Sequence, residues 1–239
     1  MNCLRSLVFI KKLDKKYRKY GLEAVIIHTP EWEFEKDRKN IEYAVKKYNI
    51  NFPIIIDKNR KLIKKFRLNF WPTQILMSKG KVIYKHIGEG SYKELENNII
   101  RFLKIKKLKR VFHKEPDYSK YPAIYLGKRK RGKIQCLASK LKVGVVYAKG
   151  KWLQKSEFLE NNEKNNSLTI LTEGETINFV AKSLGKPAKM VIRLNNKAIK
   201  SLTISKPELY KIVKLKNQTR QKLTLTAKSR IAVYSFSFQ

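Results

Sequence analysis

Cys3 is the first residue with evident chemistry, because it lies at the head of the segment MNCLRSLVFIKKL. A cysteine thiolate is a nucleophile that exchanges with disulfide bonds. The apolar spacing of this segment predicts an amphipathic helix, and the free N–H groups at a helix start stabilise a thiolate. Redox cysteines usually work in pairs, so the chemistry open to Cys3 depends on a second thiol.

Cys136 is the other cysteine, and its setting differs. It lies in KIQCLAS between apolar residues, which favours a small buried core residue over a reactive thiol. Two cysteines in 239 residues do not form a disulfide framework. A bridge between Cys3 and Cys136 would join two predicted domains, and we do not expect it.

The other candidate groups are weaker. His28, in IIHTPE, could tune a nearby thiol, although a hydrogen-bonded histidine at a strand end fits the pattern better. Glu31 and Glu33 follow a proline at a helix start, where acidic side chains suit the helix dipole. His86 and His113 have no cysteine, histidine or carboxylate at metal-ligand spacing. We therefore predict neither a metal site nor a cofactor.

Residues 1–105 alternate helix and strand. The first helix ends at Gly21, and the apolar run at 22–28 is typical of a strand buried on both faces of a parallel sheet. A helix, an extended segment at 52–57, a short helix, a hairpin turning at SKGK and a last helix are expected to follow. The inner face of the first helix is predicted to consist of Leu4, Leu7, Val8, Leu13 and Tyr17.

Residues 121–239 contain short alternating segments without a convincing long helix. Turn signals separate these segments, which predicts an all-β sandwich of jelly-roll-like type. Residues 106–120 form a basic linker between the two predicted domains. The expected strands are KVGVVYA, SLTILTEG, TINFVAKS, AKMVIRLN, LYKIVKLK, KLTLTAK and IAVYSFSF.

The net charge of +36 would attract anionic partners at low salt. The lysines occupy the exposed side of every periodic segment, which favours solvated faces over one binding stripe. The densest clusters, at 104–114 and 127–133, are candidate anion contacts or parts of a basic linker. They lack interleaved aromatic residues, so a nucleic-acid partner is not expected.

The apolar runs, such as LVFI and AVII, are far shorter than the roughly 20 residues that span a bilayer. Lysines at 11–12 interrupt the apolar stretch at the start, so we predict neither a secretory leader nor a transmembrane segment. The chain as written is therefore expected in the cytoplasm.

Three stretches together resemble a known family: HTPEWEFEKD at 28–37, FWPTQILMSKGKVIYKHIGEGSYKELE at 70–96 and YPAIYLGKRK at 121–130. They are similar to the soluble part of DipZ-type and TlpA-like thiol-disulfide oxidoreductases of the redoxin family. There a thioredoxin-fold domain precedes a small β-sandwich, the thioredoxin-like C-terminal domain. The resemblance implies an α/β thioredoxin-like domain at 1–105 and this sandwich at 121–239.

The active site of the family reads Cys-x-Asn-Cys-Leu-Arg, and MNCLR at 1–5 matches its second part. The resemblance therefore implies that Cys3 is the resolving cysteine and that the nucleophilic cysteine falls one residue before Met1. It also implies that Pro72 is a cis-proline facing the site and that Trp71 offers its backbone to a substrate segment.

The central strand that precedes the first cysteine in the family is likewise absent from the sequence as given. Its two neighbours could close up, a partner could donate a strand, the true start could lie upstream, or the gene could be in decay. With a truncated start, the location implied is periplasmic or otherwise extracytoplasmic, and a membrane electron-relay protein is an implied partner.

We expect a thiol-disulfide oxidoreductase or isomerase-like protein that acts on protein thiols and disulfides. Because only the resolving cysteine is present, the sequence leaves open whether the chain is an enzyme. The alternative is a non-catalytic binding protein whose β-sandwich and basic surface hold a glycan or an anionic polymer.

Overall fold

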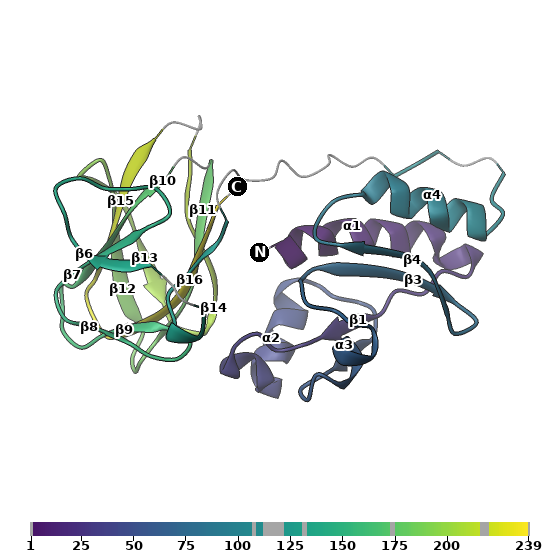
Figure 1. Cartoon of the computed structure of the whole chain (residues 1–239), viewed down its shortest axis with the longest axis horizontal. Helices are drawn as coiled ribbons and strands as arrows, with labels where there is room; N and C mark the ends of the chain where they lie inside the picture. The colour runs from purple at the N-terminus through teal and green to yellow at the C-terminus, as the bar shows by residue number, and fades with distance from the viewer. Residues whose placement is uncertain are drawn as a thin grey trace. The chain divides into compact units, whose positions relative to one another are not determined.

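The computed structural model describes residues 2–106, 109–111, 122–130, 133–172, 175–215 and 220–238. The chain divides into two compact units, an N-terminal unit at 1–116 and a C-terminal unit at 117–239, shown in Figure 1. Most of the predicted linker at 106–120, together with His113 and part of both basic clusters, lies outside the described residues.

The N-terminal unit is built from helices and short strands. Its first helix passes into one 3-10 turn that ends at Gly21, where φ is +94° and the N–H donates to the Arg18 carbonyl. Glycine adopts this left-handed conformation without strain, which explains the predicted stop. The elements are α1 (Asn2–Tyr17), η1 (Arg18–Tyr20), β1 (Ile26–His28), η2 (Glu33–Lys36), α2 (Arg38–Lys47), β2 (Ile54–Ile56), α3 (Lys61–Lys65), β3 (Thr73–Ser78), β4 (Lys81–Ile87) and α4 (Tyr92–Phe102).

The strands of this unit form two separate pairs within the described residues. β1 pairs in parallel with β2, and β3 pairs with β4 as the predicted antiparallel hairpin. β1 is shorter than the predicted strand at 22–28 and is only partly buried along its length. The prediction of a strand buried on both faces is therefore wrong for this segment, because β1 is only partly buried and, among the described residues, has a hydrogen-bonded neighbour on one side.

Helices α1 and α4 pack together to make the core of the N-terminal unit. Phe9, Leu13 and Tyr17 of α1 are buried against Leu95 and Ile99 of α4. Burial of apolar surface between the two helices is the main stabilising contribution here.

The inner face of α1 is rotated from the predicted one. Val8 is 58% exposed, whereas Phe9, which the prediction omitted, is 3% exposed. The polar Ser6 also belongs to the inner face, because its hydroxyl lies 3.2 Å from the buried Tyr92 hydroxyl. A pattern that counts only apolar residues misplaces a helix face that includes such a polar contact.

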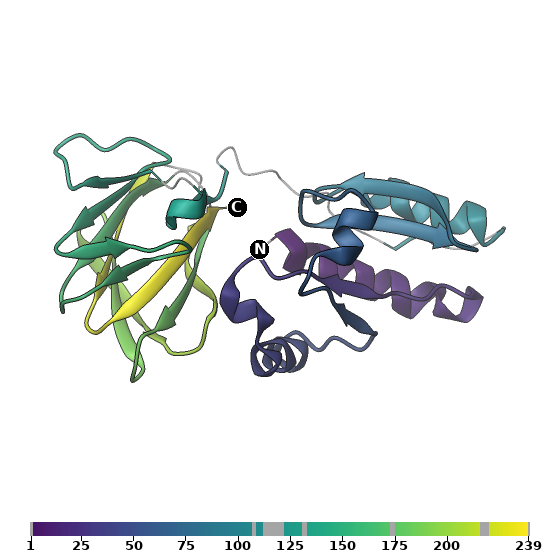
Figure 2. The same cartoon turned by 60° about the horizontal axis from the view of Figure 1, so that its bottom comes forward.

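The C-terminal unit contains two sheets that enclose a common core, as Figures 1 and 2 show. One sheet has the order β13-β12-β15-β10-β7-β6, and the other has β14-β11-β16-β9-β8, with β5 paired to β16. The strands are β5 (Ile124–Tyr125), β6 (Ile134–Cys136), β7 (Val146–Lys149), β8 (Trp152–Gln154), β9 (Leu159–Asn161), β10 (Ser167–Thr172), β11 (Thr176–Ser183), β12 (Ala188–Leu194), β13 (Lys197–Ile204), β14 (Glu208–Lys214), β15 (Gln221–Ala227) and β16 (Ile231–Phe238), and η3 (Lys128–Lys130) follows β5.

Both sheets contribute fully buried side chains to this core. Ile170 and Leu225 come from the first sheet, and Phe179 and Phe236 come from the second. The two phenylalanine rings stack with their centroids 6.0 Å apart, on neighbouring strands. All seven predicted strands are present.

Candidate functional site

Cys3 lies in the first turn of α1 as an exposed free thiol. Cys136 is also free and exposed, so the prediction that it is a buried core residue is wrong. It belongs to β6, which among the described residues is an edge strand paired with β7, and such a strand leaves part of its apolar sequence in solvent.

The pKa of the Cys3 thiol lies above its ordinary value. The main cause is desolvation by the surrounding atoms, and the carboxylates of Glu31 and Glu35 add to it. The positive charge of the chain's amino terminus acts in the opposite direction. The residue keeps exposed surface, so reagents reach it, but less of the thiol is ionised at neutral pH than in an ordinary cysteine.

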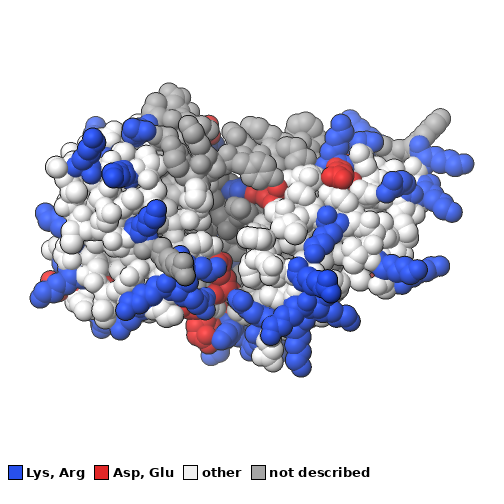
Figure 3. All heavy atoms as spheres, in the orientation of Figure 1, with Lys and Arg blue, Asp and Glu red and all other residues white. Residues whose placement is uncertain are grey.

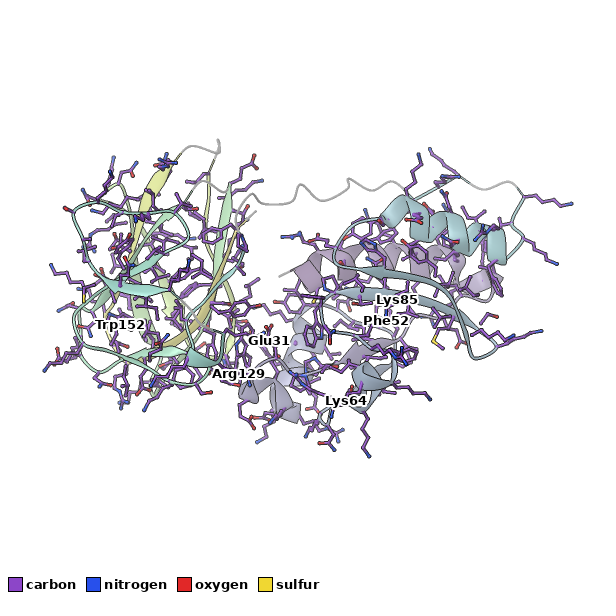
Figure 4. All side chains as sticks on the ribbon, viewed as in Figure 1. Glu31, Phe52, Lys64, Lys85, Arg129 and Trp152 are labelled. Atoms are coloured by element: carbon purple, nitrogen blue, oxygen red, sulfur yellow. The ribbon has the colours of Figure 1, made fainter. Side chains whose placement is uncertain are left out.

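The loop after β1 brings acidic groups to the start of α1. Glu35 folds its carboxylate back onto this loop, where Oε2 accepts the Glu31 N–H at 2.6 Å and the Trp32 N–H at 3.3 Å. Desolvation raises the pKa of Glu35 despite these bonds. Nε2 of His28 lies 3.0 Å from the Glu35 carbonyl, so this histidine has the predicted hydrogen bond at a strand end. Figure 4 labels Glu31 in this loop.

Arg5 and Glu89 fix the start of α1 against the loop before α4. Nε of Arg5 donates to Oε1 of Glu89 at 2.6 Å, and a second guanidinium nitrogen donates to Oε2, so the pair is bidentate. Glu89 is 2% exposed, and its Oε1 also accepts from the Tyr92 hydroxyl. Bidentate pairs of this kind hold both groups in one geometry.

Glu89, between two glycines, was not among the site residues predicted from the sequence. Arg5 is the arginine of the Cys-Leu-Arg motif, two residues after Cys3. Arg5 lies on a helix face that packs against other parts of the unit. A guanidinium that is partly buried there requires an acidic partner. That requirement is the signal that could have identified the glutamate.

The peptide bond between Trp71 and Pro72 is cis. It directly precedes β3, and the Trp71 side chain is 36% exposed. The guanidinium carbon of Arg60 lies 5.9 Å from the centre of the Trp71 ring, and a terminal nitrogen of Arg60 donates to the Pro30 carbonyl at 3.3 Å. Arg60 therefore connects the end of β1 with the segment that leads into β3.

These contacts place the acidic loop after β1 beside Cys3 and the cis peptide beside Arg60. The roles predicted for Cys3, Pro72 and Trp71 in thiol exchange stay predictions. Within the part of the chain that the structure describes, no group of three or more His, Cys, Asp or Glu residues could hold a metal ion. Within the same residues, no helix is both long and apolar enough to cross a bilayer.

Residues 125–238 match the family model described as "Thioredoxin like C-terminal domain". Protein DipZ of Mycobacterium bovis is 30% identical over 104 residues, which cover 43% of this chain and 15% of DipZ. Thiol-disulfide oxidoreductase ResA of Bacillus cereus is 33% identical over 95 residues, which cover 39% of this chain and 52% of ResA. The solved structure of a putative thiol:disulfide interchange protein DsbE from Chlorobium tepidum shares 19% identity, covers 43% of this chain and 71% of its own, and gives a TM-score of 0.39.

The predicted resemblance to DipZ-type thiol-disulfide oxidoreductases is confirmed by these matches. The chain spans 15% of the length of DipZ and about half of that of ResA. The residues that the family model matches lie in the sheet-rich C-terminal unit.

Proposed function

We propose that this relative of DipZ and ResA is a thiol-disulfide exchange protein in which Cys3 is the resolving cysteine. The observation that carries the proposal is the exposed free thiol in the first turn of α1, next to the motif residues Leu4 and Arg5. The protein would act on the disulfide bonds of other proteins, and this proposal is supported by its similarity to ResA, which is named a thiol-disulfide oxidoreductase.

The proposed cycle needs two thiols. A first thiolate attacks one sulfur of a substrate disulfide, which breaks that S–S bond and releases one substrate thiol. The Cys3 thiolate then attacks the first sulfur, forms an intramolecular disulfide and releases the second substrate thiol. The substrate gains two electrons and the protein dithiol loses them, so a dithiol donor must reduce the protein again. Under this proposal, the first thiol would stand three residues before Cys3, as the family motif implies.

The remaining site residues have supporting parts in this proposal. Trp71, directly before Pro72, would pair its backbone with an extended substrate segment, as the family resemblance implies. An extracytoplasmic location and a membrane electron-relay protein as donor belong to the same proposal for a longer form. The domain limits 1–105 and 121–239 and the jelly-roll-like connectivity of the sandwich also remain proposals.

The proposal is tested by adding one cysteine before Met1 in a Cys136→Ser background. The new residue and Cys3 are expected to form an intramolecular disulfide in a glutathione buffer, measured by mass shift after thiol alkylation. A matched chain with the new cysteine before Met1 and Cys3→Ser cannot form it. Only mixed disulfides with glutathione in the first chain would contradict the assigned role of Cys3.

A second candidate function is binding of an anionic polymer, and one cluster in the C-terminal unit favours it. Nζ of Lys200, on the exposed edge strand β13, lies 3.3 Å from the Lys211 carbonyl of β14. Desolvation and the nearby charge of Lys211 lower the pKa of Lys200. A bound anion would offset the repulsion between these two ammonium groups.

Heparin is a suitable sulfated probe for this second function. Replacing Lys200 and Lys211 by Gln is expected to weaken heparin binding more than replacing Lys12 and Lys19, which carry the same charge in the N-terminal unit. A titration over a range of salt concentrations gives the comparison. Equal losses of heparin binding in the two double variants would mean that only the net charge matters. This result would count against a site at β13.

A further inference from the structure

The sheet that contains β12 and β15 has one face toward the core of the C-terminal unit and one outer face. Ile192 of β12 and Leu225 of β15 are buried in the core. Side chains alternate along a strand, so Arg193, Thr224 and Thr226 lie on the outer face. Arg193 and Thr224 are register partners, and Thr226 follows two residues later on β15. The three side chains therefore form one group, and each is half-buried.

Hydrogen bonds leave this group rich in unused donors. A terminal nitrogen of Arg193 donates to the Thr226 hydroxyl oxygen at 3.2 Å, and among the described residues this is the one hydrogen bond of the guanidinium. The hydroxyl of Thr224 lies 3.1 Å from that of Thr169, its register partner on β10. Thr169 is 2% exposed, so its proton goes to Thr224, whose own proton is left to donate outward. The Thr226 proton is also available, because its oxygen accepts from Arg193.

This sheet has no carboxylate to pair with these donors. The strands β6, β7, β10, β12, β13 and β15 contain six basic residues and no Asp or Glu. Lys222, two residues before Thr224, adds a further positive charge on the outer face. A partly buried guanidinium is usually paired with an acid, as Arg5 is with Glu89 in the N-terminal unit. Arg193 has a neutral hydroxyl in that position, so its charge is not offset by the described residues.

Tyr147 borders the group on one side. It is the register partner of Thr169 on β7, so it lies on the same outer face. Its ring is 1% exposed, and its hydroxyl accepts the Lys142 N–H at 2.8 Å. The segment before β7 therefore covers this face over β7 and β10, whereas the face over β12 and β15 stays partly open. An ion bound at the border would be shielded from water on one side, which strengthens its hydrogen bonds.

We propose that Arg193, Thr224 and Thr226 form a binding site for a tetrahedral oxyanion, a phosphate or sulfate group. The planar guanidinium offers paired N–H groups that match two oxygens of such a group. The two hydroxyl protons reach the remaining oxygens from the sheet surface, and Lys222 contributes charge. Every available group in this set is a donor and none is anionic, which excludes a metal cation as the ligand.

This site is independent of the thiol and of the cluster at Lys200 and Lys211. Lys200 is the register partner of Ile192, so its side chain belongs to the opposite side of the sheet from Arg193. The oxyanion is held by directed hydrogen bonds, and the guanidinium can supply two of them in parallel. A lysine at the same position keeps the charge but loses this geometry, which gives a sharp test.

The test titrates the full chain with inorganic phosphate and with sulfate, at pH 7 and constant ionic strength. The readout is the nuclear magnetic resonance shifts of the Thr224 and Thr226 backbone amides, with the Phe179 amide of the other sheet as reference. We expect saturable shifts at the two threonines and none at the reference. Acetate, whose carboxylate is planar, should bind more weakly than phosphate and sulfate.

Arg193→Lys is expected to weaken phosphate binding by at least about fivefold, whereas Arg230→Lys, at an exposed position of the same unit, should leave it unchanged. Thr226→Val, which removes a hydroxyl at nearly constant shape, should weaken it by at least about threefold relative to Thr203→Val on β13, and it replaces the first variant if that chain fails to fold. Tighter binding of glycerol 3-phosphate than of inorganic phosphate would assign the oxyanion to an ester on a larger molecule, and the reverse order would assign a free ion.

Three results would overturn the proposal. They are the absence of saturable shifts with both anions, equal phosphate affinities of the original chain and the two site variants, and acetate binding as tight as that of phosphate.

Discussion

Cys3 combines an exposed surface with a pKa above the ordinary thiol value. A cysteine that attacks substrates in solution needs a large thiolate fraction at neutral pH. A resolving cysteine attacks a sulfur held beside it at high effective concentration, so it can work with a smaller fraction. The raised pKa therefore fits the second of the two positions better than the first.

The carboxylates near Cys3 give a test at this scale. In a Cys136→Ser background, Glu31→Gln removes a negative charge that raises the pKa of the thiol. More thiolate then exists below that pKa, so alkylation by iodoacetamide at pH 8 should become faster. The control Glu33→Gln changes a residue of the same loop whose carboxylate pairs with Lys36. A rate that rises equally in both variants, or in neither, would contradict the assignment.

Arg5 and Glu89 position the helix that carries Cys3, and removing the charge of Glu89 should loosen it. Glu89→Gln leaves the partly buried guanidinium with a weaker partner, which we expect to lower the free energy of unfolding by about 2–3 kcal/mol. The control is Glu42→Gln, which breaks an exposed pair with Arg38 and should cost about 0.5 kcal/mol or less. Urea unfolding followed by circular dichroism at 222 nm measures both. Equal losses of free energy of unfolding in the two variants would contradict the positioning role of the Arg5–Glu89 pair.

At the scale of elements, pattern alone predicted the strands that alternate and missed those that do not. β12 and β15 have regular inward apolar positions, whereas β13 is exposed at almost every residue and was not predicted. β13 is an edge strand, so pairing to β12 holds it in place while burial contributes little. Helix α1 was predicted from its periodicity, but its inner face depends on contacts with α4 that no local pattern contains.

The core between the two sheets yields a stability prediction. Phe179 and Phe236 are fully buried and stacked, so Phe179→Ala should destabilise the C-terminal unit by about 3–5 kcal/mol through lost burial and the resulting cavity. The matched control is Ile199→Ala on β13, where the side chain is 41% exposed and the expected change is within about 0.5 kcal/mol. Hydrogen exchange of the β11 amides in increasing urea reports the difference. A comparable effect of the two substitutions would contradict the two-sheet core.

At the scale of the whole molecule, the charge of +36 acts on stability as well as on binding. Lys and Arg are scattered over the surfaces of both units on the face shown in Figure 3, and they do not gather into a single stripe. The charge count could be read from the sequence, and so could its spread over the exposed side of each element. The ion pairs that offset this charge locally, such as that of Lys16 with the buried Glu96, could not be read from the sequence.

Mutual repulsion among these charges should make the fold sensitive to salt. Screening reduces the repulsion in the compact state, so raising sodium chloride from about 20 to about 300 mM should increase the melting temperature by roughly 2–5 °C. Differential scanning calorimetry measures this directly. A melting temperature that falls with salt would mean that favourable ion pairs outweigh the excess of positive charge.

The most direct test of the resolving role of Cys3 is insulin reduction by an extended chain. The extension consists of a run of alternating valine and isoleucine residues followed by one cysteine directly before Met1, and dithiothreitol serves as donor. We expect turnover at least about tenfold above two controls, one with serine in place of the added cysteine and one with Cys3→Ser. Equal rates in all three chains would contradict the claim that Cys3 completes a two-thiol exchange site.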